Sequence, residues 1–546
     1  MIQRLFAATV LLAISFTCLQ ADEKIIGNPN APQGGLFKYN LGQAPTTLNP
    51  LSSTDYYATQ VQNYIVETLL VRNADTYEWE SNLAKDWSVS KDGKAFEFTL
   101  REGAKWHDGK PVTIEDVKFS FDAIVHPKNK YKTAHLKPYY ENIEKAEIIG
   151  ENKIRFTASQ IYFGNFNTVA GLSVLPKHVY ENPTEEQEKE LNKTIVGSGP
   201  YTLDNFRRGN SITLKANENW WGKKVDKFKG IYNFDRILMR FISESTVALQ
   251  RLVRGDLDFQ TLSSEDYVRK AVGPQWGKRV HKEKIQNKAP QGYNFIGWNM
   301  ENPLFKSKKV RKALYHLVNR AEMIEKFRYD MSKPATGPLY QQSVYADPDV
   351  EPIEYSPKKA KDLFKEEGWK PGSDGILQKE IDGEMKKMSF TIIEPNQEFE
   401  RYLTMFQQHA KKQGVDVNVR FLEWNSFIQL LNERKFEAVR LGWSGGAVDW
   451  DPKQIWHSES ANASGSNFIN YSNPKVDKLI DESRKLLDKE KRIKKLREVY
   501  RLIAEDVPYV FLFNDEFSFY GHTDRMGREK DTYNYTVGTD YWWIKK

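Results

Sequence analysis

The feature that most constrains the fold is a strand–helix alternation in the last third of the chain. Three apolar runs have the length and β-branched content of strands, and two segments with helical periodicity separate them. The predicted strands cover residues 389–393, 415–421 and 436–441, and the predicted helices cover residues 399–412 and 427–433. Because such alternation builds βαβ units, the sequence predicts an α/β fold with a largely parallel sheet.

The last of these strands leads into a loop rich in glycine, tryptophan and aspartate. In an open α/β sheet, ligands bind beyond the carboxyl ends of the strands, and the loop falls at such an end. Trp443 and Trp450 offer flat apolar faces, Asp449 and Asp451 can hold a cation, and Arg440 can hold an anion. The alternative is a surface turn with packed indoles and satisfied carboxylates.

The same loop matches the Gly-x-Ser-x-Gly pattern of serine hydrolases at residues 442–446. That motif requires a helix directly behind the serine, whereas glycines and then Pro452 follow Ser444. A secreted hydrolase that uses Ser444 with Asp515 and His522 remains an alternative, and it requires turnover of an ester or amide.

The N-terminus has the pattern of a secretory signal peptide. Arg4 precedes an apolar run at residues 5–16, which is too short for a stable membrane anchor, and cleavage after Ala21 is predicted. A lipoprotein acylated on Cys18, the single cysteine, is the alternative. Cleavage at Ala21 leaves a chain without cysteine, which excludes disulfides and cysteine ligands or nucleophiles.

Composition narrows the function class further. The 546 residues are 40% hydrophobic and 28% charged, as in a soluble globular protein of several domains. The net charge of +7 comes from basic residues scattered among acidic ones, which indicates a solvated surface rather than a nucleic-acid site. The nine histidines show no metal-ligand spacing. We expect no nucleic-acid partner, no metal and no cofactor.

Several other elements are predicted from periodicity and capping residues. They are a strand at 36–41, a helix at 57–69, hairpin strands near 87–89 and 96–100, a helix capped by Thr113, a Gly-rich turn at 197–201, a helix at 245–254 ended by Gly255, a strand at 293–298, a helix capped by Ser307 and one long helix from Asn473 to Ile503.

Five stretches, in this order, resemble the extracytoplasmic solute-binding proteins of peptide ABC transporters, family 5. The stretches are residues 100–122, 196–222, 303–327, 442–452 and 468–513, so the resemblance covers essentially the mature chain. Residues 232–236, His126-Pro127 and Tyr139-Tyr140 are similar to the branch linked to uptake of peptides and microcin C.

The resemblance implies a periplasmic-binding-protein-like α/β fold with two lobes around a hinged cleft and a smaller third domain. The implied division is a signal peptide at 1–21, lobe 1 at 22–74, 196–289 and 516–546, the small domain at 75–195 and lobe 2 at 290–515. The hinge crossings would lie near Ala289 and Asn514.

The implied function is capture of oligopeptides in the interlobe cleft by hinge closure, without chemistry on the ligand. A periplasmic monomer would deliver the peptide to inner-membrane ABC permease subunits. The same fold could instead bind an oligosaccharide or another solute.

In this family, a Gly-Trp-x-x-Asp-Tyr segment anchors the α-ammonium group of the peptide through its aspartate. Gly442 and Trp443 match that segment, and Asp449-Trp450 stands for Asp-Tyr, although five residues separate Trp443 from Asp449. Asp451 could substitute for Asp449.

Further site residues follow from the resemblance. Arg440 resembles a position that meets the peptide carboxylate, with a structural ion pair as the alternative. Asn467 and Phe468 would offer backbone hydrogen bonds to an extended peptide. The predicted ligand-binding site also includes Ser444, Trp298, Asn299 and Tyr56, and packing is an equal alternative for Tyr56.

Overall fold

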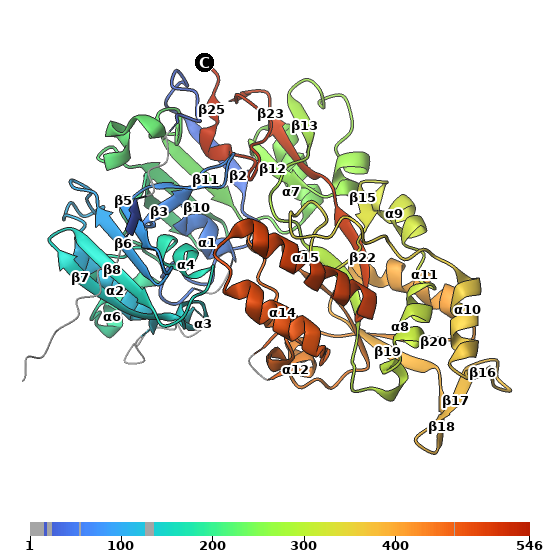
Figure 1. Cartoon of the computed structure of the whole chain (residues 1–546). Coiled ribbons are helices and arrows are strands. Elements are labelled where there is room, and N and C mark those ends of the chain that lie inside the picture. Colours follow the sequence, from blue (N-terminus) through green and yellow to red (C-terminus); the bar gives the residue numbers. More distant parts are fainter. Residues whose placement is uncertain (1–15, 19–23, 54–55, 126–135, 463–464) are drawn as a thin grey trace, which may run out of the picture. The chain divides into compact units, whose positions relative to one another are not determined.

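The computed structural model describes residues 16–18, 24–53, 56–125, 136–462 and 465–546, which form two compact units (Figure 1). Unit 1 comprises Met1–Phe259, Arg525–Glu529 and Gly538–Lys546, and unit 2 comprises Gln260–Asp524 and Lys530–Val537. Most of the predicted signal peptide, and His126-Pro127, lie outside the described residues. The predicted three-part division, with crossings near Ala289 and Asn514, stays a prediction.

Unit 1 contains an antiparallel sheet that supplies much of its core. The strand order is β1 (Phe16–Cys18), β5 (Ala84–Ser90), β6 (Ala95–Leu100), β8 (Lys153–Ala158) and β7 (Ile143–Gly150). Helix α2 (Ile114–Val125) packs against β7 and β8 and buries Val117 and Phe121. The Asp116 carboxylate accepts the Thr113 N–H at 2.8 Å, so the predicted helix start at Thr113 is confirmed.

A second group of strands in unit 1 surrounds β2 (Leu36–Asn40). Strand β2 runs parallel to β11 (Arg236–Arg240), and it also pairs in parallel with β12 (Phe259–Leu262) at Phe259. Beyond β11, β10 (Ser211–Ala216) and β9 (Tyr201–Arg207) continue antiparallel. The chain end returns as β24 (Met526–Gly527) paired with β25 (Trp543–Ile544). Helix α7 (Ser245–Arg254) ends at Gly255, as predicted. The φ of Gly255 is 82°, a left-handed conformation that glycine adopts readily because it has no β-carbon.

The helix predicted at 57–69 is wrong in its second half. Helix α1 (Tyr56–Gln62) ends early, and the chain forms β3 (Leu70–Arg72), which pairs with β4 (Trp79–Ser81). The reason is tertiary: the carbonyls of Tyr64 and Ile65, which a longer helix would use, accept the N–H groups of Tyr201 and Gly199. The Glu67 side chain then accepts two indole N–H groups from the distant Trp220 and Trp221. The shorter helices of unit 1 are α3 (Lys137–Tyr140), α4 (Asn165–Ala170), α5 (Lys177–Tyr180) and α6 (Glu185–Leu191).

Unit 2 is built on a six-stranded mixed sheet, which carries the predicted βαβ units. The strand order is β15 (Ser332–Pro334), β22 (Tyr509–Asp515), β14 (Tyr293–Trp298), β21 (Ala438–Trp443), β19 (Ser389–Glu394) and β20 (Asp416–Phe421). Strands β19, β20 and β21 are mutually parallel where they pair, as predicted, whereas β14 pairs antiparallel with β21 and β22.

The helices of unit 2 cover this sheet and bury an apolar face against it. They are α8 (Lys308–Tyr315), α9 (Arg320–Arg328), α10 (Pro357–Glu366), α11 (Glu400–Lys411), α12 (Trp424–Asn432), α13 (Lys453–Trp456), α14 (Pro474–Arg484) and α15 (Lys489–Asp506). The single helix predicted from Asn473 to Ile503 is therefore two helices. Asp488 begins the second one, because its carboxylate accepts the Lys491 N–H at 3.0 Å.

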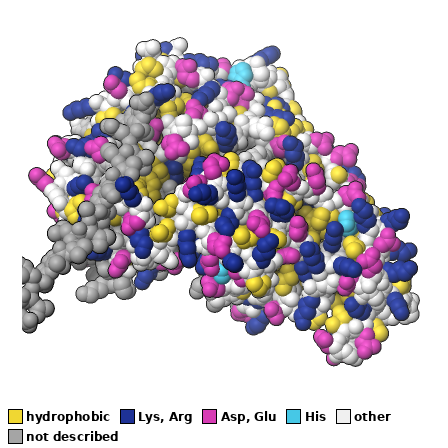
Figure 2. Space-filling model, viewed as in Figure 1, with side chains coloured by type: hydrophobic (Ala, Val, Ile, Leu, Met, Phe, Trp, Pro, Cys, Tyr) yellow, Lys and Arg dark blue, Asp and Glu magenta, His cyan; other side chains and the backbone are white. Residues whose placement is uncertain are grey.

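A three-stranded sheet in unit 2 consists of β16 (Lys370–Pro371), β17 (Leu377–Ile381) and β18 (Glu384–Lys387). Strand β13 (Val280–Ile285) pairs antiparallel with β23 (Ser518–Thr523). Figure 2 shows basic and acidic side chains interspersed over the visible face, in keeping with a solvated surface. Within the described residues, no helix is long and apolar enough to cross a membrane, and no three His, Cys, Asp or Glu side chains gather as a metal site.

Candidate functional site

Among the described strands, the second half of β21 is paired on one side only. Strand β19 pairs with β21 at Ala438 and Val439, and β21 then continues along β14 to Trp443. Gly442 in this extension is exposed, and a β-carbon there would lie 2.9 Å from Asn294 Oδ1. The extension therefore presents main chain rather than side chain beyond the end of β19, which suits pairing with another extended chain.

Arg440 begins this extension and lies in the interior. Its guanidinium donates to both carboxylate oxygens of Glu394 and, at 3.4 Å, to Asn294 Oδ1. It also lies 3.4 Å from the ring centroid of Phe399. Burial raises the pKa of Glu394, and the hydrogen bonds from Arg440 oppose that rise. The guanidinium is thus satisfied by protein groups, and the predicted role toward a ligand carboxylate stays a prediction.

Aromatic rings stack behind the end of β21. The Trp443 indole lies 5.9 Å from Phe468 and 6.2 Å from Phe295, with interplanar angles of 11° and 20°. Phe295 in turn stacks on Tyr509 at 3.8 Å. Trp443 and Phe468 are half-buried, so the structure brings two of the predicted site residues together near the surface of unit 2.

The aspartates of the loop are both paired with arginines. Asp449 Oδ1 accepts the Tyr345 hydroxyl at 2.7 Å and lies 3.7 Å from Arg492 Nη2. Asp451 Oδ2 accepts Arg484 Nε at 3.0 Å, and its Oδ1 accepts the Lys453 N–H at 3.1 Å. Trp450 between them is 8% exposed and belongs to the core.

Three predicted residues are enclosed by the fold. Asn467 is fully buried, donates to His457 O and Tyr471 O, and accepts the Tyr471 N–H. Asn299 donates to main-chain carbonyls of 434 and 436 at 3.1 and 2.8 Å. Trp298 has no exposed surface and lies at the end of β14 away from Trp443. These side chains hold turns and core, so a role for them in binding stays a prediction.

The hydrolase arrangement is not formed. Ser444 is exposed on an irregular stretch that continues to α13, so no helix lies directly behind it. Asp515 pairs with Arg328 and accepts the Ser332 hydroxyl at 2.7 Å. His522 is buried on β23, with Nε2 3.3 Å from Glu283 Oε1. The remaining predicted residue, Tyr56, belongs to unit 1, where 67% of it is exposed and it packs edge-on against Tyr57.

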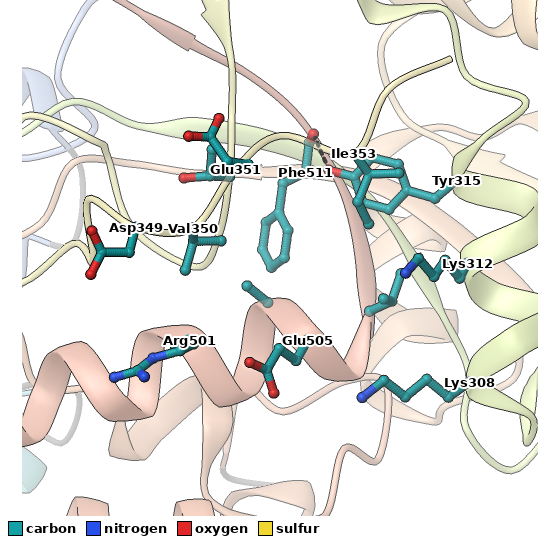
Figure 3. A pocket seen from close by; sticks show the side chains of 13 residues that line it. Lys308, Lys312, Tyr315, Asp349, Val350, Glu351, Ile353, Arg501, Glu505 and Phe511 are labelled. Carbon is teal, nitrogen blue, oxygen red and sulfur yellow. Dashed lines mark hydrogen bonds between the residues drawn. The ribbon is translucent and has the colours of Figure 1, made fainter. Parts of the chain in front are cut away.

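Unit 2 also contains a separate cavity of about 380 Å³ between α8, α15 and the 349–353 loop (Figure 3). Basic and acidic groups mix on its wall, and Tyr315 donates to the Phe511 carbonyl at 2.9 Å beside it. Two of its cations already have acidic neighbours, since Lys308 lies 3.6 Å from Asp506 and Arg501 lies 3.0 Å from Asp347. None of the predicted site residues lines it, and we assign it no ligand.

Sequence reasoning missed the partners that fix the charged residues of this region. Glu394, Phe399, Tyr345 and Arg492 are far from the loop in sequence, and each meets it only through the fold. One local signal existed for Glu394: it ends a buried parallel strand, at the edge where the loop also lies.

Comparison with known proteins places this geometry in a family. The model of the bacterial extracellular solute-binding proteins, family 5, matches residues 78–466. The chain belongs to this family. Its members' location outside the cytoplasm agrees with the predicted export, and the family consists of binding proteins rather than enzymes. The predicted fold class is confirmed as well, because solved family 5 structures superpose with TM-scores of 0.72–0.77.

Individual family 5 relatives match over nearly the full length. The oligopeptide-binding protein AppA of Bacillus subtilis is 30% identical over 541 residues, covering 96% of this chain and 94% of the relative. The probable peptide-binding protein YejA of Agrobacterium fabrum is 26% identical over 569 residues, covering 95% and 91%. The structure of B. subtilis AppA in complex with a nonapeptide has a TM-score of 0.76 at 28% identity and covers 95% of this chain and 100% of that chain.

Proposed function

We propose that this protein captures oligopeptides outside the inner membrane and delivers them to the permease of an ABC importer. The observation that carries the proposal is the full-length likeness to AppA, a protein named for oligopeptide binding and solved with a nonapeptide. The proposed location is the periplasm, after removal of the signal peptide, and the proposed working form is a monomer.

The extension of β21 supports an extended peptide as the ligand. Main-chain groups of Gly442 and its neighbours would pair with the peptide as an added strand, which recognises backbone and not sequence. The half-buried rings of Trp443 and Phe468 would give apolar contact to side chains of many shapes. Affinity would then depend little on peptide sequence.

The proposed mechanism is hinge closure without chemistry. A peptide enters while the lobes are open, and the closed form is selected because it binds the peptide more tightly. The closed form docks on the permease and releases the peptide there. The proposal keeps Asp449 as the anchor for the α-ammonium group of the peptide. In that role, the Asp449 carboxylate would contact the ligand while it also pairs with Tyr345 and Arg492.

Native mass spectrometry of the mature protein, as purified and again after denaturation and refolding, tests the proposal. We expect copurified peptides that disappear on refolding and whose return raises the melting temperature, because a ligand of the folded state stabilises it. A carbohydrate mass would instead favour the oligosaccharide alternative. A ligand-free protein that ignores peptides would contradict the proposal, and hydrolysis abolished by Ser444→Ala would then support the hydrolase.

A further inference from the structure

Unit 1 contains a carboxylate among tyrosines, remote in sequence from the loop of unit 2. Asp540 lies in the short turn Thr539–Tyr541 near the chain end. Its surroundings, which we call the tyrosine cluster, come from four separate segments of unit 1. The cluster consists of Tyr39, Tyr64, Tyr201 and Tyr232.

Packing contacts define the tyrosine cluster. Tyr64 and Tyr201 meet edge to face at 5.6 Å, and Tyr201 and Tyr232 meet edge to face at 6.1 Å. Burial raises the pKa of all four tyrosines, and the nearby charge of Asp540 adds to that rise in each. Since one carboxylate affects all four hydroxyls, Asp540 lies within reach of every ring in the cluster.

The turn that carries Asp540 is held in place by the loop before β11. The Tyr232 N–H donates to the Asp540 carbonyl at 2.7 Å, and the Asn233 amide donates to the Trp542 carbonyl at 3.0 Å. Tyr232 adopts a φ of 57°, a conformation that costs a non-glycine residue free energy. The fold thus maintains a strained residue where it fixes Asp540 and places a ring beside it.

The charge of Asp540 lacks a cationic partner. Its carboxylate accepts a hydrogen bond from the Tyr64 hydroxyl, and no lysine or arginine of the described residues forms an ion pair with it. Burial raises the pKa of Asp540, and the Tyr64 hydrogen bond opposes the rise. A carboxylate withdrawn from water without a cation is costly, so the site favours a cation that a ligand brings.

Several residues of the site reach the surface of unit 1. Asp540, Tyr39, Tyr64 and Tyr232 all keep some exposed surface, in contrast to Tyr201, which is 1% exposed. The Tyr201 hydroxyl is already used, since it donates to the Phe234 carbonyl at 3.0 Å. A carboxylate surrounded by tyrosine hydroxyl oxygens suits a compact ammonium group, which can donate hydrogen bonds to several of these oxygens at once.

We propose that Asp540 and the tyrosine cluster form a cation site in unit 1 that binds an alkylammonium group of the peptide ligand. The inference rests on the proposed peptide-binding function. It adds a second recognition point, separate from the backbone pairing at β21, which would favour peptides that carry an ammonium group. That group is a lysine side chain if Asp449 holds the peptide amino terminus, and it is the amino terminus if Asp449 does not.

Calorimetric titration of the refolded mature protein distinguishes these sources and tests the site. The probes are four nine-residue alanine–serine peptides: one with a free amino terminus, one acetylated, one acetylated with a central lysine, and one acetylated with norleucine in its place. The wild type is compared with Asp540→Asn, and Asp226→Asn, an exposed aspartate of unit 1 that pairs with Lys229, is the matched control.

We expect Asp540→Asn to weaken binding of at least one ammonium-bearing peptide by 10-fold to 100-fold and to leave the affinities of the two peptides without an ammonium group within 2-fold. Loss confined to the free amino terminus identifies that group as the ligand, and loss confined to the lysine peptide identifies the side chain. Asp226→Asn should change none of the affinities.

Equal affinities of wild type and Asp540→Asn for all four peptides would overturn the inference while leaving the peptide-binding function intact. A wild type that binds none of the peptides would instead contradict the proposed function, and the inference with it. Circular dichroism of each variant checks that it is folded before titration.

Discussion

The region around β21 in unit 2 and the tyrosine cluster in unit 1 hold carboxylates in opposite ways. In unit 2, Glu394, Asp449 and Asp451 each have an arginine within 4 Å. In unit 1, Asp540 and the nearby Glu67 accept hydrogen bonds from tyrosine and tryptophan instead. Trp220 connects the two acids, because it donates to Glu67 and packs 5.4 Å from Tyr232.

The difference determines how each region responds to change. A buried ion pair fails when one partner is removed, whereas a buried acid held mainly by uncharged hydrogen-bond donors responds to pH and to added cations. We therefore expect the stability of the region around β21 to fall when one member of an ion pair is replaced. The stability contributed by the acids of unit 1 should instead change with pH.

The largest expected effect is at the ion pair of unit 2. Arg440→Met leaves Glu394 buried without its cation and should lower the free energy of unfolding by about 3–5 kcal/mol. Urea denaturation followed by tryptophan fluorescence measures the change. Adding Glu394→Leu should restore most of the loss. A loss below about 1 kcal/mol, together with weaker peptide binding, would show instead that Arg440 serves the ligand.

The next effect is a pH dependence located at Glu67. Burial raises the pKa of Glu67 to about 7 from 4.5. Because the folded state binds this proton more tightly than the unfolded state, its contribution is complete below pH 4.5 and is lost as the pH rises to about 7. The loss should be about 3 kcal/mol.

Glu67→Gln is the matched control for that pH dependence. It removes the titrating group, so the difference in unfolding free energy between pH 4.5 and pH 8 should shrink by about 3 kcal/mol relative to the wild type. The variant loses some stability at every pH, because an amide cannot accept both indole N–H groups. Parallel pH profiles of the two proteins would contradict the assignment to Glu67.

In the absence of ligand, Asp540 should contribute a smaller pH dependence of the unfolding free energy, in the same direction as that of Glu67. Asp540→Asn removes a carboxylate that lacks a cation and should raise the unfolding free energy at pH 8 by about 1 kcal/mol. The gain should shrink as the pH falls and the carboxyl group of the wild type becomes protonated, because the pKa of Asp540 is raised. Destabilisation at pH 8 would mean that Asp540 has a structural partner, and the contrast between the two regions would then fail.

Ser444→Ala should have the smallest effect. The residue is exposed and lies outside the ion pairs of unit 2, so stability should change by less than about 0.5 kcal/mol. Peptide affinity should change little, because the proposed pairing uses main-chain groups and not the Ser444 hydroxyl. Thermal denaturation and calorimetry measure both. A loss of ester or amide hydrolysis in this variant is the one result that would revive the hydrolase alternative.

Local patterns predicted the elements well and their long-range partners poorly. The strands ending in Glu394 and Trp443 follow from apolar runs, and the start of α2 at Thr113 follows from capping chemistry. The early end of α1 did not, because the carbonyls of Tyr64 and Ile65 bond to main-chain N–H groups more than 130 residues away.

The candidate site shows the same limit. Its loop was found from composition, but the pairing of Asp449 with Tyr345 and Arg492 depends on segments about 100 and 40 residues distant. The tyrosine cluster had no local signal at all, since its members come from β2, β9 and two separate turns that meet only in the folded chain.

The most direct test of the account compares mirror-image ligands. The refolded mature protein is titrated calorimetrically with a nine-residue L-peptide of alanine, serine and lysine, and with the all-D peptide of the same sequence. Pairing with β21 requires the backbone handedness of an L-peptide, so we expect a single-site isotherm for the L-peptide and at least 100-fold weaker binding for the D-peptide. Equal binding of the two, or no binding of either, would contradict capture of an extended peptide along β21.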